Sequence, residues 1–164
     1  METNALIDFS NTKKVLLDYA EELQHMYTSS LISNDHFATG GLIQAVKYNV
    51  VVDNRVISIE MQLAKYWKWV EEGRKPGKFP PIDKILKWIQ DKPVIPKPNE
   101  NGKLPSPKSL AFLIARKIAN EGTKGTHDLH DSNKILWKKF QEQIDIALSK
   151  DLEGYVAKFI ITSF

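Results

Sequence analysis

The 164-residue chain has a length typical of one domain, and its 42% hydrophobic and 26% charged residues exclude a wholly disordered protein. The absence of cysteine excludes disulfide scaffolding, thiolate metal sites and thiol catalysis. A net charge of +3, spread along the chain, permits contact with nucleic acid without arguing for it. The sequence has no signal-peptide pattern and no apolar run of about eighteen residues, so we expect soluble synthesis in the cytoplasm and no membrane contact.

The N-terminal third predicts an amphipathic helix followed by a β-hairpin. Apolar side chains three and four residues apart predict the helix over roughly residues 11–31, packed on a sheet. Two runs rich in β-forming residues, 43–52 and 55–63, flank the turn residues Asp53 and Asn54 and predict the hairpin. The odd-numbered residues of its second strand should face the core. The apolar residues of the helix are Leu16, Tyr19, Leu23 and Met26.

Residues 65–92 hold three of the four tryptophans, Trp67, Trp69 and Trp88. We expect a short helical or bent segment that ends at Gly73. A turn with Pro76 and Gly77 follows it. Pro80 and Pro81 then open an amphipathic helix, because proline is tolerated in a first helical turn. Its apolar face carries Ile82, Ile85, Leu86 and Ile89.

The C-terminal half predicts two helices and a strand. Ser106 and Pro107 predict the start of a helix that Gly122 ends, and residues 122–131 predict a flexible loop. The last helix should be capped by Ser132 or Asn133 and should end at Gly154, before a short closing strand over 155–161 that is rich in β-forming residues. Its apolar positions, four apart, are Leu136, Phe140, Ile144 and Leu148.

These elements predict the α+β fold class. We expect an N-terminal helix, a central antiparallel hairpin, helices packed on one face and a short C-terminal strand. Residues 1–164 should form a single domain. The stretch 92–107 contains five of the eight prolines and predicts a long exposed loop that reaches toward a partner.

Few residues have a pattern typical of catalysis or metal binding. His127 and His130, each followed by an aspartate, could hold a divalent ion, but no further ligand cluster accompanies them. We interpret them as part of a solvated loop in which Asp131 helps to cap the next helix. No nucleophile elbow or phosphate-binding glycine loop occurs, and the adjacent Glu71 and Glu72 do not indicate acid–base catalysis. We therefore expect no enzyme activity, no metal and no cofactor.

Nucleic-acid binding is an alternative. The stretch 65–87 interleaves aromatic side chains with lysine and arginine, which can stack on bases and meet phosphates. The predicted helices over 80–90 and 107–121, with Gly122 to Gly125, could also imitate a winged helix-turn-helix. The proline-rich gap between those two helices is far longer than that motif needs, which is about three to four residues.

The order helix, hairpin and then the sequence of residues 66–81 resembles the tail-completion, or neck, proteins of tailed bacteriophages. In that group the second strand runs into an aromatic-x-x-aromatic-Val-Glu-x-Gly segment, whose glycine is followed here by Arg-Lys-Pro-Gly-Lys-Phe-Pro-Pro. The resemblance covers roughly residues 12–125. The loop at 92–107 and the loop with the two histidines depart from compact versions of the pattern. The matching residues are Tyr66, Trp69, Val70, Glu71 and Gly73.

The resemblance implies a non-enzymatic structural protein of the virion, assembled in the cytoplasm of the bacterial host. Such a protein would form part of a homo-oligomeric ring in the head–tail connector, touching connector or adaptor proteins and tail proteins, while viral DNA passes through the lumen. Segment 65–81 would be the main contact, with the loop at 92–107 and the C-terminus as secondary arms. Its expected interface residues are Trp67, Trp69, Glu71, Arg74, Lys75 and Phe79.

Overall fold

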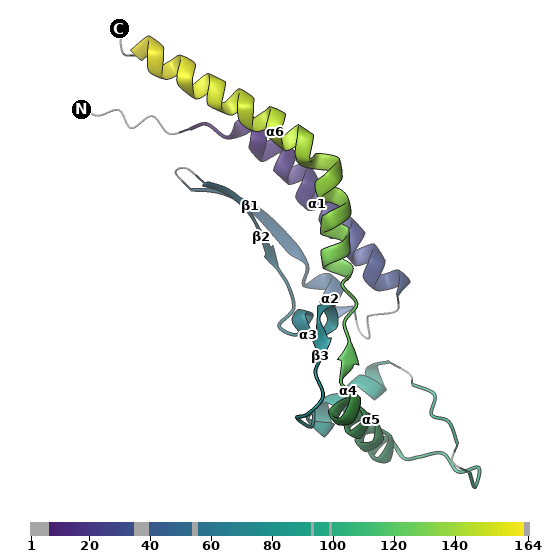
Figure 1. Ribbon diagram of the computed structural model, residues 1–164. Coiled ribbons are helices and arrows are strands. Elements are labelled where there is room, and N and C mark those ends of the chain that lie inside the picture. Colours follow the sequence, from purple (N-terminus) through teal and green to yellow (C-terminus); the bar gives the residue numbers. More distant parts are fainter. Residues whose placement is uncertain (1–6, 35–39, 54–55, 93, 99, 163–164) are drawn as a thin grey trace. The chain divides into compact units, whose positions relative to one another are not determined.

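A computed structural model describes residues 7–34, 40–53, 56–92, 94–98 and 100–162 (Figure 1). These residues form helices and two antiparallel strand pairs, which confirms the predicted α+β class. No helix among them is long and apolar enough to cross a bilayer. The elements are α1 (Ser10–Ser33), α2 (Gly41–Gln44), β1 (Lys47–Asp53), β2 (Val56–Gln62), α3 (Trp67–Glu71), β3 (Gly73–Arg74), α4 (Ile82–Asp91), α5 (Pro107–Glu121), β4 (Thr123–Lys124) and α6 (Asp128–Thr162).

The chain forms two compact units. Unit 1 comprises Met1–Ser30, Ala45–Leu63 and Asp128–Phe164, and unit 2 comprises Leu31–Gln44 and Ala64–His127. Each unit has a framework of its own, helices on a hairpin in unit 1 and a helix pair with a short strand pair in unit 2. That residues 1–164 act as one domain stays a prediction.

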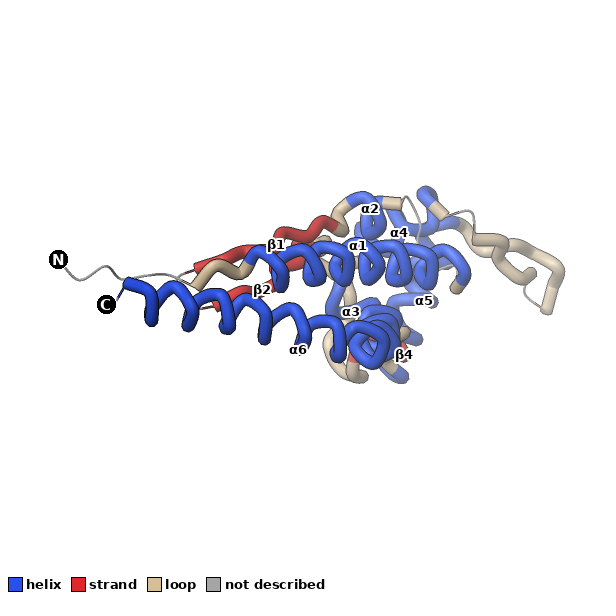
Figure 2. Tube along the Cα trace, turned by 90° about the horizontal axis from the view of Figure 1, so that it is seen from above, coloured by secondary structure: helices blue, strands red, loops and turns tan. Residues whose placement is uncertain are grey.

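Unit 1 consists of two long antiparallel helices, α1 and α6, that run side by side along the hairpin (Figures 1 and 2). The buried core lies between these elements, and the rings of Tyr19 and Phe140 meet edge to face at 5.4 Å. Lys139 Nζ on α6 donates to both carboxylate oxygens of Glu22 on α1. The predicted packing of helices on one face of the hairpin is therefore confirmed for unit 1. The core residues are Tyr19, Leu23, Leu136 and Phe140, with Ile59 and Met61 of β2 packed against them.

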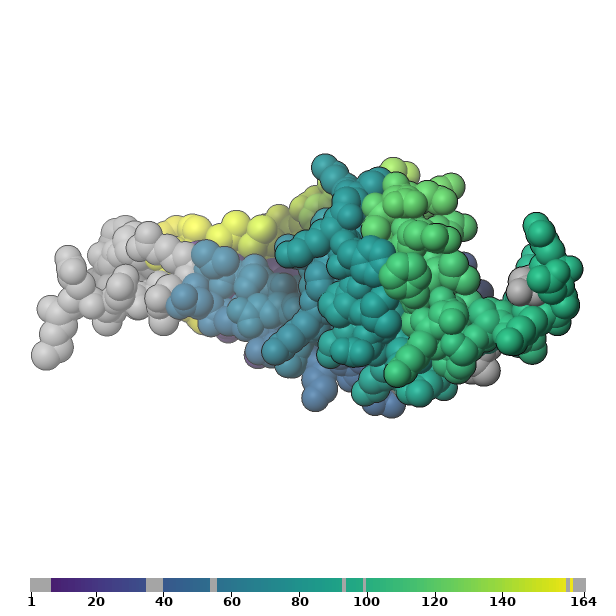
Figure 3. Space-filling view, turned by 90° about the horizontal axis from the view of Figure 1, so that it is seen from below, coloured from purple at the N-terminus to yellow at the C-terminus, as the bar shows by residue number. Residues whose placement is uncertain are grey.

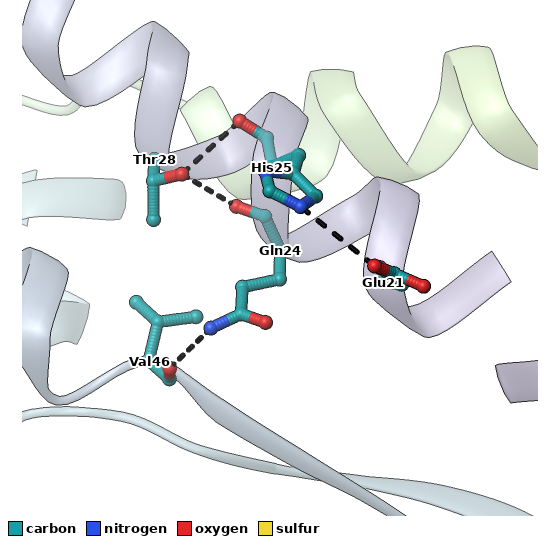
Figure 4. Close-up of polar contacts among 5 residues, drawn as sticks. All are labelled: Glu21, Gln24, His25, Thr28 and Val46. Carbon is teal, nitrogen blue, oxygen red and sulfur yellow. Dashed lines mark hydrogen bonds and ion pairs between the residues drawn. The ribbon is translucent and has the colours of Figure 1, made fainter. Parts of the chain in front are cut away.

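The hairpin has the predicted alternation. β1 and β2 pair in antiparallel register, with Val50 opposite Ile59. The odd-numbered side chains of β2 are half-buried and the even-numbered ones are exposed, as expected for a strand with one face on a core. Gln24 Nε2 on α1 donates to the carbonyl of Val46 at 2.8 Å (Figure 4), which fixes the entry to β1 on the helix. The turn residue Asn54 lies outside the described residues.

The prediction that the first strand begins at residue 43 is wrong, because α2 includes Ile43 and Gln44 and β1 starts at Lys47. β-branched residues are disfavoured in helices by only a few tenths of a kcal/mol, roughly up to 0.7 kcal/mol per residue. Leu42 of α2 is fully buried in this turn. Burial of an apolar side chain stabilises by about 1.5–3 kcal/mol, which outweighs that preference.

The predicted closing strand at 155–161 is also wrong, because α6 continues without a break to Thr162. Gly154 does not end the helix, since a glycine in a helix interior is disfavoured by only about 1 kcal/mol relative to alanine. The apolar spacing of four residues continues through Leu152, Val156 and Ile160, which is the period of a helix rather than of a strand. The periodicity therefore outweighed the β preference of the individual residues.

The start of α6 differs from the prediction as well. The helix begins at Asp128, so His130 and Asp131 are helical rather than parts of a loop, and Ser132 lies within the helix rather than at its cap. Asp128 is buried and accepts a hydrogen bond from Ser30 Oγ of α1, which places a carboxylate at the positive end of the helix dipole. This contact between segments 98 residues apart fixes a helix start that local capping rules place four residues later.

Unit 2 contains α3, the pair β3–β4, and α4 packed on α5. Ser106 caps α5 by accepting a hydrogen bond from Ser109 N–H, and Gly122 ends the helix, as predicted. The helices expected after residue 66 and after Pro81 are also confirmed. The described part of the loop 92–107 is mostly exposed, as predicted, and projects from the helix pair (Figure 2).

Candidate protein-interaction surface

The segment after α3 is held in place by backbone hydrogen bonds to the segment that follows α5. β3 pairs with β4, and further bonds extend the contact at both ends. Residues 70–77 therefore lie in a fixed position along residues 119–127 of unit 2, although the pairing itself is only two residues long. The additional bonds run from Thr126 N–H to Val70 O (2.9 Å), from His127 N–H to Glu71 O (3.1 Å) and from Gly77 N–H to Ala119 O (2.7 Å).

Three glycines, Gly73, Gly122 and Gly125, allow this close approach, and we call them the glycine clamp. A Cβ atom at Gly73 would lie 2.2 Å from the carbonyl oxygen of Thr123. A Cβ atom at Gly125 would lie 2.3 Å from the carbonyl oxygen of Glu71. These distances are far inside van der Waals contact with backbone atoms that cannot move aside, so only glycine fits.

The clamp presents a rigid turn, residues 74–81, on the surface of unit 2. The Arg74 guanidinium donates to the carbonyl of Lys78, which closes the turn from within. Lys75 and Lys78 are exposed. The face of the molecule in Figure 3 shows the teal part of the chain that includes this turn lying against the green part that includes α5.

Trp67 and Trp69 point in different directions because they lie two residues apart on a helix, about 200° around its axis. Trp67 is half-buried, and Lys68 Nζ lies 5.9 Å from the centre of its ring. Trp69 is 66% exposed. The ring of Trp69 therefore lies on the surface of unit 2, where a partner protein could cover it.

Phe79 at the end of the turn contacts Phe112 of α5, with ring centres 5.6 Å apart and the planes tilted by 43°. The two side chains are 42% and 50% exposed, and we call them the aromatic pair. Sequence reasoning missed Phe112 as a candidate for this surface. The available signal was its position outside the buried stripe of α5, where a large apolar side chain has no role in the core of unit 2.

The structure brings the predicted interface residues into one continuous stretch of unit 2 but divides them by exposure. Trp69, Lys75 and Phe79 are exposed, Trp67 and Arg74 are half-buried, and Glu71 is buried at 6%. Only the exposed members can make broad contact with another protein without rearrangement. Their role in an interface stays a prediction.

The two histidines do not form a metal centre with the residues that the structure describes. His127 has a positive φ of 56° in the connection to α6, and His130 lies in the first turn of that helix. In the described ranges, no group of three or more histidine, aspartate or glutamate side chains is placed to hold an ion. Metal chemistry therefore has no support from the geometry of these residues.

Comparison with known proteins does not place the chain in a family. No protein-family model matches it, and no solved structure matches it. Ribosomal RNA small subunit methyltransferase H of Protochlamydia amoebophila is 29% identical over 84 residues, which are 51% of this chain and 26% of the methyltransferase. The matched region thus spans about a quarter of that curated relative. A match of this extent and identity transfers no activity to this chain.

Proposed function

We propose that this chain is a structural virion protein of the head–tail connector, or neck, of a tailed bacteriophage, where it completes the tail attachment site and has no enzymatic role. The proposal starts from the resemblance of residues 12–125 to tail-completion proteins. The observation that carries it is the turn at 74–81, which the glycine clamp holds rigidly while Trp69 and Phe79 stay exposed beside it.

A turn that is already ordered favours association with a partner protein. A partner gains little from a mobile loop, because ordering the loop offsets part of the contact energy. A clamped turn has already lost that conformational entropy on folding. Aromatic side chains on such a turn are typical anchors of protein interfaces, and their removal often weakens binding by 2 kcal/mol or more, roughly thirtyfold. Neighbouring copies and the adjacent connector and tail proteins are the proposed partners.

Trp69→Ala should lower the yield of joined phage particles by roughly tenfold or more while leaving the fold intact. The side chain is 66% exposed, so its loss changes the free energy of unfolding little. The measurement mixes tail-less heads of the source phage with tails and purified chain, and counts infectious particles. Ile32→Ala, which removes a similarly exposed apolar side chain of α1, serves as the control. Heads and tails that join at the normal yield without any added chain would disprove the connector proposal.

DNA binding is the second candidate, and the charge of unit 2 favours it. Unit 2 carries fourteen lysines and arginines against seven aspartates and glutamates, a net charge of +7. A basic unit of this kind attracts nucleic acid, and binding through several phosphates weakens steeply as salt increases.

For a connector subunit we expect weak binding to double-stranded DNA, with a dissociation constant no lower than about 10⁻⁶ M at physiological salt, the range of non-specific binding. A titration of fluorescent duplex at two salt concentrations, about 50 and 200 mM, measures this. The variant Lys75→Glu with Lys78→Glu tests whether the turn contributes. Nanomolar binding at the higher salt that both charge reversals abolish would favour the DNA-binding function instead.

A further inference from the structure

The charge of the chain is divided between its two units. Unit 2 has a net charge of +7, whereas unit 1 carries nine lysines and arginines against thirteen aspartates and glutamates, a net charge of −4. Unlike charges steer two molecules together from a distance, and like charges on the same faces oppose contact. The division therefore favours contact between unit 2 of one copy and unit 1 of another over contact between identical units.

Unit 1 offers an apolar groove of about 330 Å³ between α1, β2 and α6. Its lining contains no charged side chain, and within it Tyr19 Oη donates to Asn133 Oδ1 at 2.5 Å. Trp137, which also lines the groove, is 48% exposed. A groove lined mostly by apolar side chains and by no charged one favours a hydrophobic side chain over a charged ligand. The remaining lining residues are Leu16, Leu23, Ile59, Met61 and Ile144.

Unit 2 offers a projecting feature of the matching chemistry, the aromatic pair Phe79 and Phe112. On α5, Lys108 and Arg116 lie four residues to either side of Phe112 and so share its face of the helix. Both are exposed, and neither makes an ion pair with any other residue in the part of the chain that the structure describes. The surface thus joins exposed aromatic rings to unneutralised positive charge.

We propose that the aromatic pair Phe79–Phe112 of one copy docks into the apolar groove of unit 1 of a second copy. The contact is head to tail, since two different surfaces meet: the first copy keeps its groove free, and the second copy keeps its aromatic pair free. Head-to-tail contacts generate rings when their rotation closes. The inference rests on the self-association in the proposed function and assigns the surfaces that would carry it. An acidic unit and an apolar groove are the features that select a second copy rather than nucleic acid as the occupant.

The absence of cysteine allows a direct test. One variant carries Arg116→Cys beside Phe112, and the other carries Gln141→Cys, which lies on α6 between the groove residues Trp137 and Ile144. Each is purified alone and mixed with the other, and a short bis-maleimide cross-linker is added. We expect a cross-linked dimer in the mixture at least tenfold more abundant than the dimers of either variant alone.

Phe112→Ser placed in the Arg116→Cys variant should reduce the mixed dimer by tenfold or more. Val156→Ser, which removes a side chain of similar exposure from α6, should leave the yield unchanged. Circular dichroism establishes that both variants stay folded. Phe112→Ser with an unchanged yield would overturn the proposal.

Other outcomes would overturn it as well. Abundant dimers of the Arg116→Cys variant alone would indicate a symmetric contact between aromatic pairs. A chain carrying both cysteines that cross-links only within itself would indicate that the two surfaces belong to one molecule. If no dimer forms at concentrations up to about 0.5 mM, a second copy does not occupy the groove. The same conclusion follows if double-stranded DNA displaces the dimer and protects the aromatic pair.

The test is independent of the test of the connector function. If Phe112→Ser abolishes the mixed dimer but heads and tails still join normally with that variant, the contact exists in solution without serving the neck. If joining requires the chain while no head-to-tail dimer forms, the connector function stands and the assigned surfaces are wrong. Each result therefore identifies which of the two proposals has failed.

Discussion

Gly122→Ala should reduce the free energy of unfolding by roughly 3–5 kcal/mol, at the upper end of the range for single substitutions. Gly122 has φ 75° and ψ −161°, a backbone conformation that is essentially restricted to glycine. A Cβ atom there would lie 2.1 Å from the carbonyl oxygen of Arg74. To remove this steric clash, the segment after α5 must move away from β3, which breaks the pairing of Arg74 with Thr123.

Urea unfolding followed by tryptophan fluorescence measures the effect. Three of the four tryptophans belong to unit 2, so the signal reports chiefly on the unit that contains the clamp. The matched control is Gly102→Ala. Gly102 also has a positive φ, 73°, but a Cβ atom added there meets nothing within 4 Å. The free energy of unfolding of Gly102→Ala should fall only by the cost of a positive φ at a residue with a Cβ atom, about 1–2 kcal/mol.

Equal losses for the two variants would show that the backbone conformation, and not the close approach of the two segments, limits residue 122. A larger loss for Gly122→Ala identifies the contact with Arg74 as the cause. In that case the same variant should also fail to join heads to tails, because the turn at 74–81 depends on the contact for its position. Stability and assembly would then be linked through one backbone contact.

Local pattern predicted the elements of this fold well where one period dominates the sequence. The spacing of Tyr19 and Leu23 predicted α1, and the alternation around Ile59 predicted the buried face of β2, because both patterns report burial on one side of a regular element. The end of α6 was predicted wrongly at Gly154. A single residue preference of about 1 kcal/mol was given more weight than an apolar period that continues past it.

The candidate surface depends on contacts that sequence patterns do not encode. Phe79 and Phe112 are separated by 32 intervening residues, and only the packing of the clamped turn on α5 brings their rings together. The orientation of Trp67 and Trp69 depended on whether residues 66–73 form a strand or a helix, and the helix places them on different sides. The sequence thus predicted which segment is exposed and aromatic, while the identity of the exposed rings required the fold.

The second large effect is expected at Asp151, which joins the two long helices of unit 1. Asp151 is 4% exposed, and its carboxylate accepts four hydrogen bonds from the start of α1. The donors are the backbone N–H groups of Asn11 and Thr12, the side-chain amide of Asn11 (2.7 Å) and the hydroxyl of Thr12 (2.6 Å). A helix N-terminus favours a negative charge, so this residue of α6 acts as a cap for α1 from 139 residues away.

Asp151→Ala should lower the free energy of unfolding at neutral pH by roughly 2–4 kcal/mol, because it leaves the buried donors of Thr12 without their acceptor. Thermal unfolding followed by circular dichroism at 222 nm measures the change. Asp145→Ala provides the control, since Asp145 lies on the same helix but is exposed. If both variants lose the same free energy of unfolding, Asp151 does not stabilise the chain by capping α1.

The same carboxylate makes the stability of unit 1 depend on pH. Burial alone would raise the pKa of Asp151, but the hydrogen bonds from Thr12 and Asn11 outweigh burial and hold the pKa below its ordinary value of 3.8. A carboxyl with a lowered folded-state pKa contributes its full stabilisation above the unfolded-state pKa and loses it as the pH falls toward the folded-state value. The difference between the wild-type chain and Asp151→Ala should therefore be constant from neutral pH down to about pH 5 and shrink below pH 4. A difference that stays constant down to pH 2 would show that shape, and not the negative charge, holds α1 to α6.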